Sequence, residues 1–93
     1  MKVYIAGKIT GNKGYREKFR AAAKKLTDQG YSVLNPAALP EGMSPQDYMQ
    51  LCTQMLFAAD MVAFLPDWVT SKGASIEYQL CIYIGKPILM LEA

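Results

Sequence analysis

The chain has 93 residues, of which 52% are hydrophobic and 11% aromatic, and a formal net charge of +2. This length predicts a single domain over residues 1–93, and the apolar content is sufficient for a core, which excludes a disordered chain. The chain has no histidine, and its two cysteines lack metal-ligand spacing, which excludes a zinc site and any Ser-His or Cys-His nucleophile pair. We expect neither a metal nor an organic cofactor.

No signal peptide is visible, and no apolar run is long enough to cross a membrane, so we expect no membrane partner. Together with the sparse cysteines, this predicts a reducing cytoplasm. Eight of the ten lysines and arginines lie in residues 2–25, and most of them are expected to face water on one helix. Because no long basic stripe with interleaved aromatic residues occurs, no nucleic-acid polymer is expected as a partner.

The first half of the chain alternates strand and helix. Residues 2–6 are a short apolar run that predicts a strand, and residues 7–14 form a loop with three glycines. A helical spacing of apolar residues begins at Tyr15, and Gly30 is placed to end that helix. Residues 31–35 predict a second strand, which the next proline stops.

The second half continues the alternation. Residues 36–45 are a loop rich in proline and glycine, and a serine N-cap followed by proline begins a helix over residues 44–59. Residues 61–65 are a continuous apolar strand. Residues 73–84 predict a third helix, which a glycine ends, and residues 87–91 predict the last strand.

This order of elements, βαβαβαβ, predicts an α/β fold. Near-continuous apolar strands that alternate with helices indicate three layers, with a four-stranded parallel sheet in the middle, as in flavodoxin-like and Rossmann-like folds. In such folds the ligand lies beyond the carboxyl ends of the strands. The loops at residues 7–14, 36–44 and 66–73 meet at that edge.

Glu77 is the first candidate for chemistry. The helix that carries it is otherwise apolar almost all round, which predicts a buried helix with Glu77 in its first turn. A buried carboxylate is costly unless something keeps it charged, and the free N–H groups and dipole of a helix N-terminus do this. Glu77 is therefore a candidate nucleophile. The alternative is a first-turn acid that complements the dipole, worth about 0.3–1 kcal/mol.

Other candidates lie in the loops at the same edge. The segment GKITG could cradle an anion with its backbone N–H groups, Lys8 and Thr10, although glycines there often serve only the turn. Ser71 caps the last helix or binds a phosphate or a sugar hydroxyl, and Trp68 stacks on a base or packs in the core. Tyr4 packs in the sheet or brings its hydroxyl to the ligand edge. The candidate substrate-binding residues are Gly7, Lys8, Thr10, Gly11, Trp68, Ser71 and Gly73.

Several motifs together resemble one family. They are VYIAGKITG, the YxV-x-NPA turn, YM before a helix, AD before an apolar strand, LPxW, and S-x-G-A-x-x-E followed by GKP. This set is similar to the DUF4406-like small domains, often found in phage and prophage proteins. Those domains are related to nucleoside 2-deoxyribosyltransferases and deoxynucleoside 5′-monophosphate N-glycosidases. The resemblance to the small domains spans nearly the whole chain, whereas that to the enzymes rests on the first strand and residues 71–77.

The resemblance implies individual roles. Glu77 holds the position of the glutamate that attacks C1′ of a 2-deoxyribose, and Tyr4 that of the tyrosine that orients it. Ser71 stands where hydrolases of 5′-monophosphates have serine and transferases of free nucleosides have aspartate. Because serine can donate to a phosphate, the 5′-monophosphate interpretation fits better, and Lys8 agrees with it. Cys52 departs from the pattern, since the enzymes have there an aspartate that helps to protonate the leaving base.

Three functions are consistent with these features. The first is an N-glycosidase or 2-deoxyribosyltransferase that acts through Glu77 on a deoxynucleoside 5′-monophosphate or nucleoside. The second is a nucleotide-binding module without catalysis, in which Cys52 marks the lost acid. The third is a small interaction domain. An open four-stranded sheet leaves edges and helix faces partly covered, so a homodimer or higher homo-oligomer is expected under each.

Overall fold

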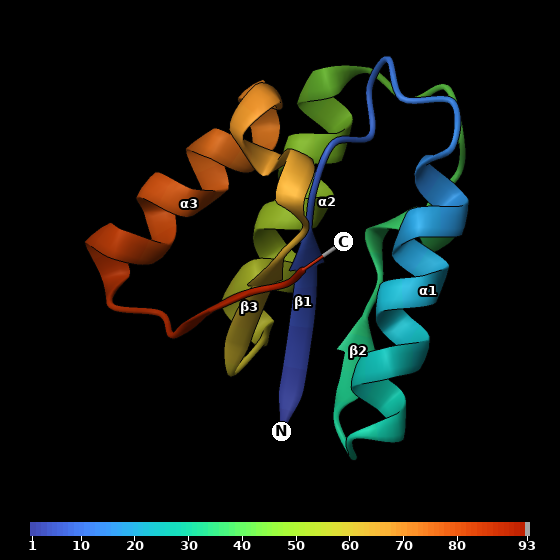
Figure 1. Cartoon of the computed structure of the whole chain (residues 1–93). Coiled ribbons are helices and arrows are strands. Elements are labelled where there is room, and N and C mark those ends of the chain that lie inside the picture. The colour runs from blue at the N-terminus through green and yellow to red at the C-terminus, as the bar shows by residue number, and fades with distance from the viewer. Residues whose placement is uncertain (93) are drawn as a thin grey trace.

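Four parallel strands form one sheet at the centre of the molecule (Figure 1). The strands are β1 (Lys2–Ala6), β2 (Ser32–Leu34), β3 (Met61–Phe64) and β4 (Ile88–Met90), and their order in the sheet is β2-β1-β3-β4. The computed structural model describes residues 1–92. The strand β2 follows β1 on one side, and β4 follows β3 on the other side, so the direction of strand order reverses between β1 and β3. In such sheets ligands bind at this point of reversal.

Three α-helices connect the strands: α1 (Tyr15–Asp28), α2 (Pro45–Ala58) and α3 (Lys72–Ile84). Two short 3₁₀ helices, η1 (Pro36–Ala38) and η2 (Pro66–Thr70), follow β2 and β3. Each of these two begins with a proline. The fixed φ of proline suits the first helical residue, and its lack of an N–H costs nothing there, because the N–H of that residue makes no hydrogen bond within the helix.

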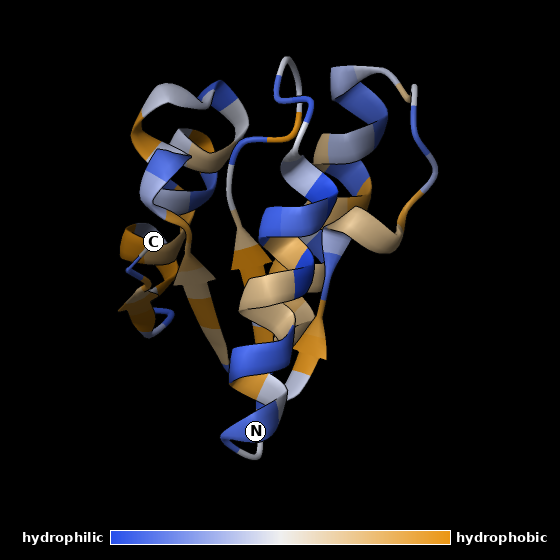
Figure 2. Ribbon diagram, turned by 45° about the vertical axis from the view of Figure 1, so that its right-hand side comes forward, coloured by the Kyte–Doolittle hydropathy of each residue, from blue (hydrophilic) through white to orange (hydrophobic). Residues whose placement is uncertain are grey.

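The helices cover both faces of the sheet (Figure 1). On one face, Phe19 of α1 packs against Val3 of β1. On the other face, Leu56 of α2 and Cys81 of α3 pack in one cluster with Tyr4. Neighbouring residues of β1 thus serve opposite layers, as the alternation of a strand requires. Figure 2 shows the hydrophobic strands behind α1, whose outward side is hydrophilic.

The predicted fold is confirmed in its order of elements, its parallel sheet and its three layers. The strands β2 and β4 are shorter than expected, at three residues each, and neither 3₁₀ helix is foreseen in the sequence. Among residues 1–92, none of the helices is long and apolar enough to span a membrane.

The prediction that the third helix is buried almost all round is wrong. Its buried residues are Ala74, Glu77 and Cys81, while Ile76 and Tyr83 are 56% and 89% exposed. The prediction took every apolar residue of α3 to be buried, whereas those on its outer side are exposed.

The helix α2 begins, and α3 ends, at the capping residue that the sequence predicts. The Ser44 side chain accepts the N–H of Asp47 at 3.1 Å, which confirms the predicted cap of α2. Gly85 ends α3 in the left-handed region, with φ 74°. Lys86 donates to the carbonyl oxygen of Ala59 at 2.6 Å and so binds the end of α2.

Candidate functional site

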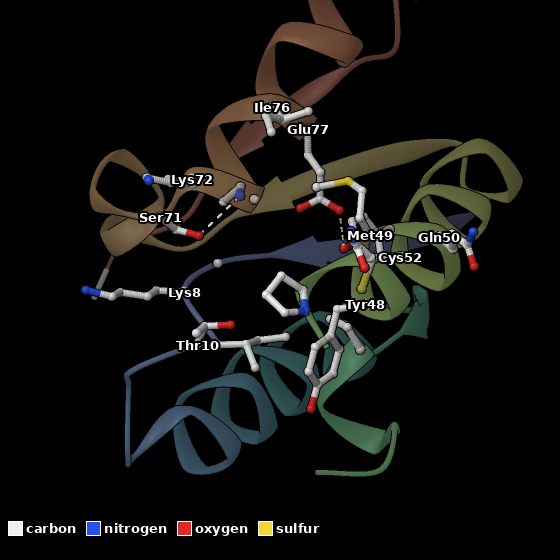
Figure 3. Close-up of a pocket in the computed structure, with 18 of the residues that line it drawn as sticks. Lys8, Thr10, Tyr48, Met49, Gln50, Cys52, Ser71, Lys72, Ile76 and Glu77 are labelled. Atoms are coloured by element: carbon white, nitrogen blue, oxygen red, sulfur yellow. Dashed lines mark hydrogen bonds between the residues drawn. The ribbon is translucent and has the colours of Figure 1, made fainter. Parts of the chain in front are cut away.

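A cavity of about 750 Å³ opens at the carboxyl ends of β1 and β3, in the size range of small-molecule sites. Its walls are the loop after β1, the start of α2, and the segment from η2 into α3. Figure 3 shows Thr10, Ser71, Met49 and Glu77, which come from these three regions, around a common space. The residues that line it are Tyr4, Gly7, Lys8, Ile9, Thr10, Pro36, Pro45, Gln46, Tyr48, Met49, Gln50, Cys52, Thr70, Ser71, Lys72, Gly73, Ala74, Ile76 and Glu77.

Glu77 lies at the floor of this cavity, and Tyr4 holds it there. The Tyr4 hydroxyl donates to Oε2 of Glu77 at 2.5 Å, and both side chains are buried (Figure 3). Tyr4 is itself fixed in the middle of β1, between Leu34 on β2 and Val62 on β3. The carboxyl group is therefore oriented from the centre of the sheet, with Oε1 left for contact with a ligand.

The expected position of Glu77 in the first turn of its helix is wrong. The helix α3 begins at Lys72, and its first turn contains no acid. Glu77 is the sixth helical residue, beyond the four free N–H groups of the N-terminus. The favourable field of a helix end falls off within one turn, so the hydroxyl of Tyr4 takes the stabilising role assigned to the helix dipole.

Burial governs the protonation of Glu77. Loss of water raises the pKa of its carboxyl from 4.5 to about 7, and the hydrogen bond from Tyr4 opposes that rise. Burial, with the nearby Glu77 charge, also raises the pKa of Tyr4 well above 10, so Tyr4 remains a hydrogen-bond donor at neutral pH. Glu77 is thus divided between its acid and carboxylate forms near neutral pH, and its anionic form is a poorly solvated nucleophile.

Cys52 lies on the opposite wall, on α2, close to the same pair. Its side chain is buried in the same cluster as Tyr4. Burial raises the pKa of this thiol and the Tyr4 contact lowers it, so the thiol is neutral near pH 7. Glu77, Tyr4 and Cys52 form one buried cluster, contributed by a helix, a strand and a second helix.

Two lysines and two hydroxyl groups lie at one end of the cavity. Lys8 and Thr10 come from the loop after β1, and Ser71 and Lys72 from the start of α3 (Figure 3). The Ser71 Oγ accepts the N–H of Ala74 at 3.2 Å, so its predicted capping role is confirmed while the hydroxyl proton can still point at a ligand. Sequence reasoning missed Lys72, although its place after the cap was a usable signal.

Asp67 joins the two loops that form the mouth of the cavity, and sequence reasoning missed it. Its carboxylate accepts the backbone N–H of Lys8 at 3.0 Å and the side-chain N–H of Asn12 at 3.5 Å, and Lys18 lies 3.5 Å away. The glycine loop therefore does bind an anion through its backbone, but that anion belongs to the chain itself. A Cβ at Gly7 would lie 2.8 Å from Leu65 and 3.2 Å from this carboxylate, so the close approach requires glycine.

Two of the predicted binding residues lie outside the cavity lining. Trp68, within η2, stacks on Tyr78 of α3 with ring centroids 4.5 Å apart and packs at an angle against Phe64 of β3, so it belongs to the aromatic packing between these elements. Gly11 forms a turn with φ 76°. The loop at residues 36–44 contributes Pro36 to the lining. Gly73 lines the cavity as expected.

Within residues 1–92, no three histidine, cysteine or acidic residues gather in a way that would hold a metal ion. The five predicted binding residues that do converge are Gly7, Lys8, Thr10, Ser71 and Gly73. The first three come from the loop after β1 and the last two from the start of α3, and Asp67 joins that loop to the segment before α3.

The family of this chain follows from a direct match. Residues 1–90 match the model of the domain of unknown function DUF4406, and the chain belongs to that family. A solved structure of a 2-deoxyribosyltransferase from the psychrotolerant bacterium Bacillus psychrosaccharolyticus has a similar fold, with a TM-score of 0.78 and 21% sequence identity. The match covers 99% of this chain and 72% of that one. No curated protein sequence matches the chain.

The burial of Glu77 predicts a measurable dependence of stability on pH. Because the pKa of Glu77 is about 7 in the folded state and about 4.5 when unfolded, the folded protein binds the proton more tightly. The free energy of unfolding contributed by this group therefore falls as the pH rises from about 4.5 to 7. Glu77→Gln imitates the protonated form and should be more stable than the wild type above pH 7, by up to about 3 kcal/mol.

Urea unfolding of both proteins at pH 5 and pH 8 measures this effect. The gain from Glu77→Gln should appear mainly at pH 8. The control is Glu17→Gln, the same substitution on the exposed side of α1, which should change stability equally little at both pH values. Parallel pH profiles for the wild type and Glu77→Gln would show that Glu77 titrates as an ordinary exposed carboxyl.

The role of Asp67 predicts a local loss of order on its removal. In Asp67→Ala the Lys8 amide loses its acceptor, so its hydrogen exchange should accelerate at least tenfold, together with that of the neighbouring loop. Asp60→Ala is the matched control, because Asp60 accepts the backbone N–H of Lys2 at the opposite end of β1. Amide exchange followed by NMR would contradict the role of Asp67 if both variants leave the Lys8 amide equally protected.

Proposed function

We propose that this chain breaks the N-glycosidic bond of a deoxynucleoside 5′-monophosphate, or of a nucleoside, through a glutamate nucleophile. The observation that carries the proposal is Glu77, a buried carboxyl held by Tyr4 at the floor of a nucleotide-sized cavity. The fold similarity to a 2-deoxyribosyltransferase supports the same class of chemistry. Water or a second base would complete the reaction, as hydrolysis or as transfer.

The geometry supports a two-step mechanism with retention at C1′. Glu77 attacks C1′ through Oε1, while Tyr4 keeps Oε2 in place. The C1′–N bond breaks, its electron pair leaves with the base, and a glycosyl ester of Glu77 forms. Water then attacks C1′ from the face that the base has left, which releases the sugar and a proton and restores the carboxylate.

The charges around the cavity support the 5′-monophosphate. Lys8 and Lys72 supply two positive charges at one end, and Thr10 and Ser71 supply hydroxyl donors beside them. A phosphate dianion matches this set, since charge-assisted hydrogen bonds are stronger than neutral ones. With the phosphate at this end, the sugar would lie over Glu77 and the base would extend toward Cys52 and Met49.

Base release is the direct test. The protein is incubated with each of the four deoxynucleoside 5′-monophosphates and the four free deoxynucleosides, and the free base is quantified by chromatography. We expect release from at least one monophosphate, a rate at least tenfold lower with the matching nucleoside, and a loss of at least 10³-fold in Glu77→Gln. The matched control is Glu41→Gln, whose carboxylate pairs with Arg16 on the surface and should not affect the rate.

Retained activity in Glu77→Gln would contradict the nucleophile. Saturable binding of a nucleotide without release of any base would instead support the second function, a nucleotide-binding module in which the cavity serves only recognition.

The exposed apolar side of α3 supports self-association of the chain. Ile76, Ile82 and Tyr83 are more than half exposed, and between Lys72 and Lys86 the helix has no charged residue apart from the buried Glu77. A surface of this kind is typical of protein contacts. A homodimer or higher homo-oligomer that covers this side of α3 is our proposal.

Light scattering at micromolar concentration measures the assembly. The wild type should have a mass above the 10.3 kDa of one chain. The double variant Ile82→Lys/Tyr83→Lys should shift it toward the monomer, because it places two like charges at the contact. Ala21→Lys, on the exposed side of α1, is the control and should keep the assembly. A monomeric wild type would contradict self-association.

A further inference from the structure

The end of the cavity away from the two lysines has no acid. Its side chains come from η1 and α2, and Figure 3 shows Met49 and Cys52 facing Glu77 from there. The lining residues that η1 and α2 contribute are Pro36, Pro45, Gln46, Tyr48, Met49, Gln50 and Cys52. Among the residues that the structure describes, Glu77 is the only one with a carboxyl side chain in the lining of the cavity.

The hydroxyl and thiol groups near this end are poor proton donors for a departing base. Tyr48 donates its proton to the carbonyl oxygen of Pro40 at 2.9 Å. The Tyr4 hydroxyl is committed to Glu77. Burial keeps the Cys52 thiol neutral and weakly acidic. The amides of Gln46 and Gln50 can donate hydrogen bonds but cannot transfer a proton at neutral pH.

A neutral purine or pyrimidine leaves an N-glycoside as an anion unless it is protonated. A positioned general acid typically contributes 10²- to 10⁴-fold to such a step. A base that already has a positive charge needs no proton, because the electron pair of the broken C1′–N bond neutralises it. The apolar lining then assists the reaction, since a carboxylate and a cation become two neutral groups in a poorly solvating space.

We infer that the substrates of this site are N-glycosides whose base is already cationic, such as deoxynucleotides with an N7-alkylated purine. The ionised Glu77 attacks C1′, the C1′–N9 bond breaks, and its electron pair cancels the positive charge of the purine, which leaves as a neutral molecule. Water hydrolyses the glycosyl ester and gives the 2-deoxyribose 5-phosphate, the Glu77 carboxylate and one proton. The inference rests on the proposed function and adds the chemical class of the leaving group.

The test compares 7-methyl-2′-deoxyguanosine 5′-monophosphate with 2′-deoxyguanosine 5′-monophosphate. Base release is measured for each, the rate with Glu77→Gln is subtracted, and the two values of kcat/KM are divided. We expect a ratio of at least 100 in favour of the methylated nucleotide. Methylation also increases the intrinsic reactivity, so the response of this ratio to variants at Cys52 is the decisive result.

Cys52→Asp places an acid at the base end of the cavity, and Cys52→Asn is its neutral match in size. The ratio should fall at least tenfold in Cys52→Asp, because only the neutral guanine gains from a proton, and should stay near the wild-type value in Cys52→Asn. Using the ratio cancels any common effect of either variant on folding or on the ionisation of Glu77.

Each other result has a distinct meaning. A wild-type ratio near one, or a ratio that changes equally in both variants, overturns the inference and leaves the N-glycosidase intact. Absence of release from both nucleotides, and from every substrate of the preceding test, overturns the proposed function together with the inference.

Discussion

The hydrogen bond between Tyr4 and Glu77 is the interaction on which the site depends. It joins the central strand β1 to α3 across one layer of the fold, and it is the contact that opposes the cost of burying the carboxyl group. Tyr4 is held by parallel neighbours on both sides, so the position of the carboxyl is as rigid as the sheet. Without this hydroxyl, burial would raise the pKa of Glu77 further and favour the neutral acid still more strongly.

A second, internal contact joins two walls of the cavity. Asp67 holds the loop after β1 against the segment that leads into α3, and these are the two walls that bear the lysines and hydroxyl groups. A carboxylate bound to a backbone N–H of a glycine loop uses the same physics by which such loops bind phosphate. Here the bound anion is the chain's own carboxylate, which fixes the position of one wall of the cavity.

The burial of Glu77 also reduces stability. A carboxyl with a pKa near 7 in the folded state destabilises the protein at neutral pH relative to a neutral side chain of the same shape. In a small domain, whose net stability is a few kcal/mol, this is a substantial cost. Groups with strongly shifted pKa values concentrate at functional sites, and this supports Glu77 as a functional residue of the cavity.

The sequence by itself determined the order of elements, the parallel sheet and the edge at which the loops meet. Alternation of apolar strands with capped helices is a local property, so it can be read without tertiary information. The candidates Glu77, Tyr4, Ser71 and Lys8 were found in the same way, by residue type and by their place after a strand or at the start of a helix, supported by the family motifs. All four line the cavity.

Only the tertiary structure decided which group stabilises Glu77, which anion occupies the glycine loop and which side of α3 is covered. Each of these depends on partners distant in sequence: Tyr4 lies 73 residues from Glu77, and Asp67 lies 59 residues from Lys8. The neighbours of Trp68 are likewise set by the packing of η2 against α3. Spacing along a chain fixes local geometry alone, whereas burial and long-range contacts arise when separate elements come together.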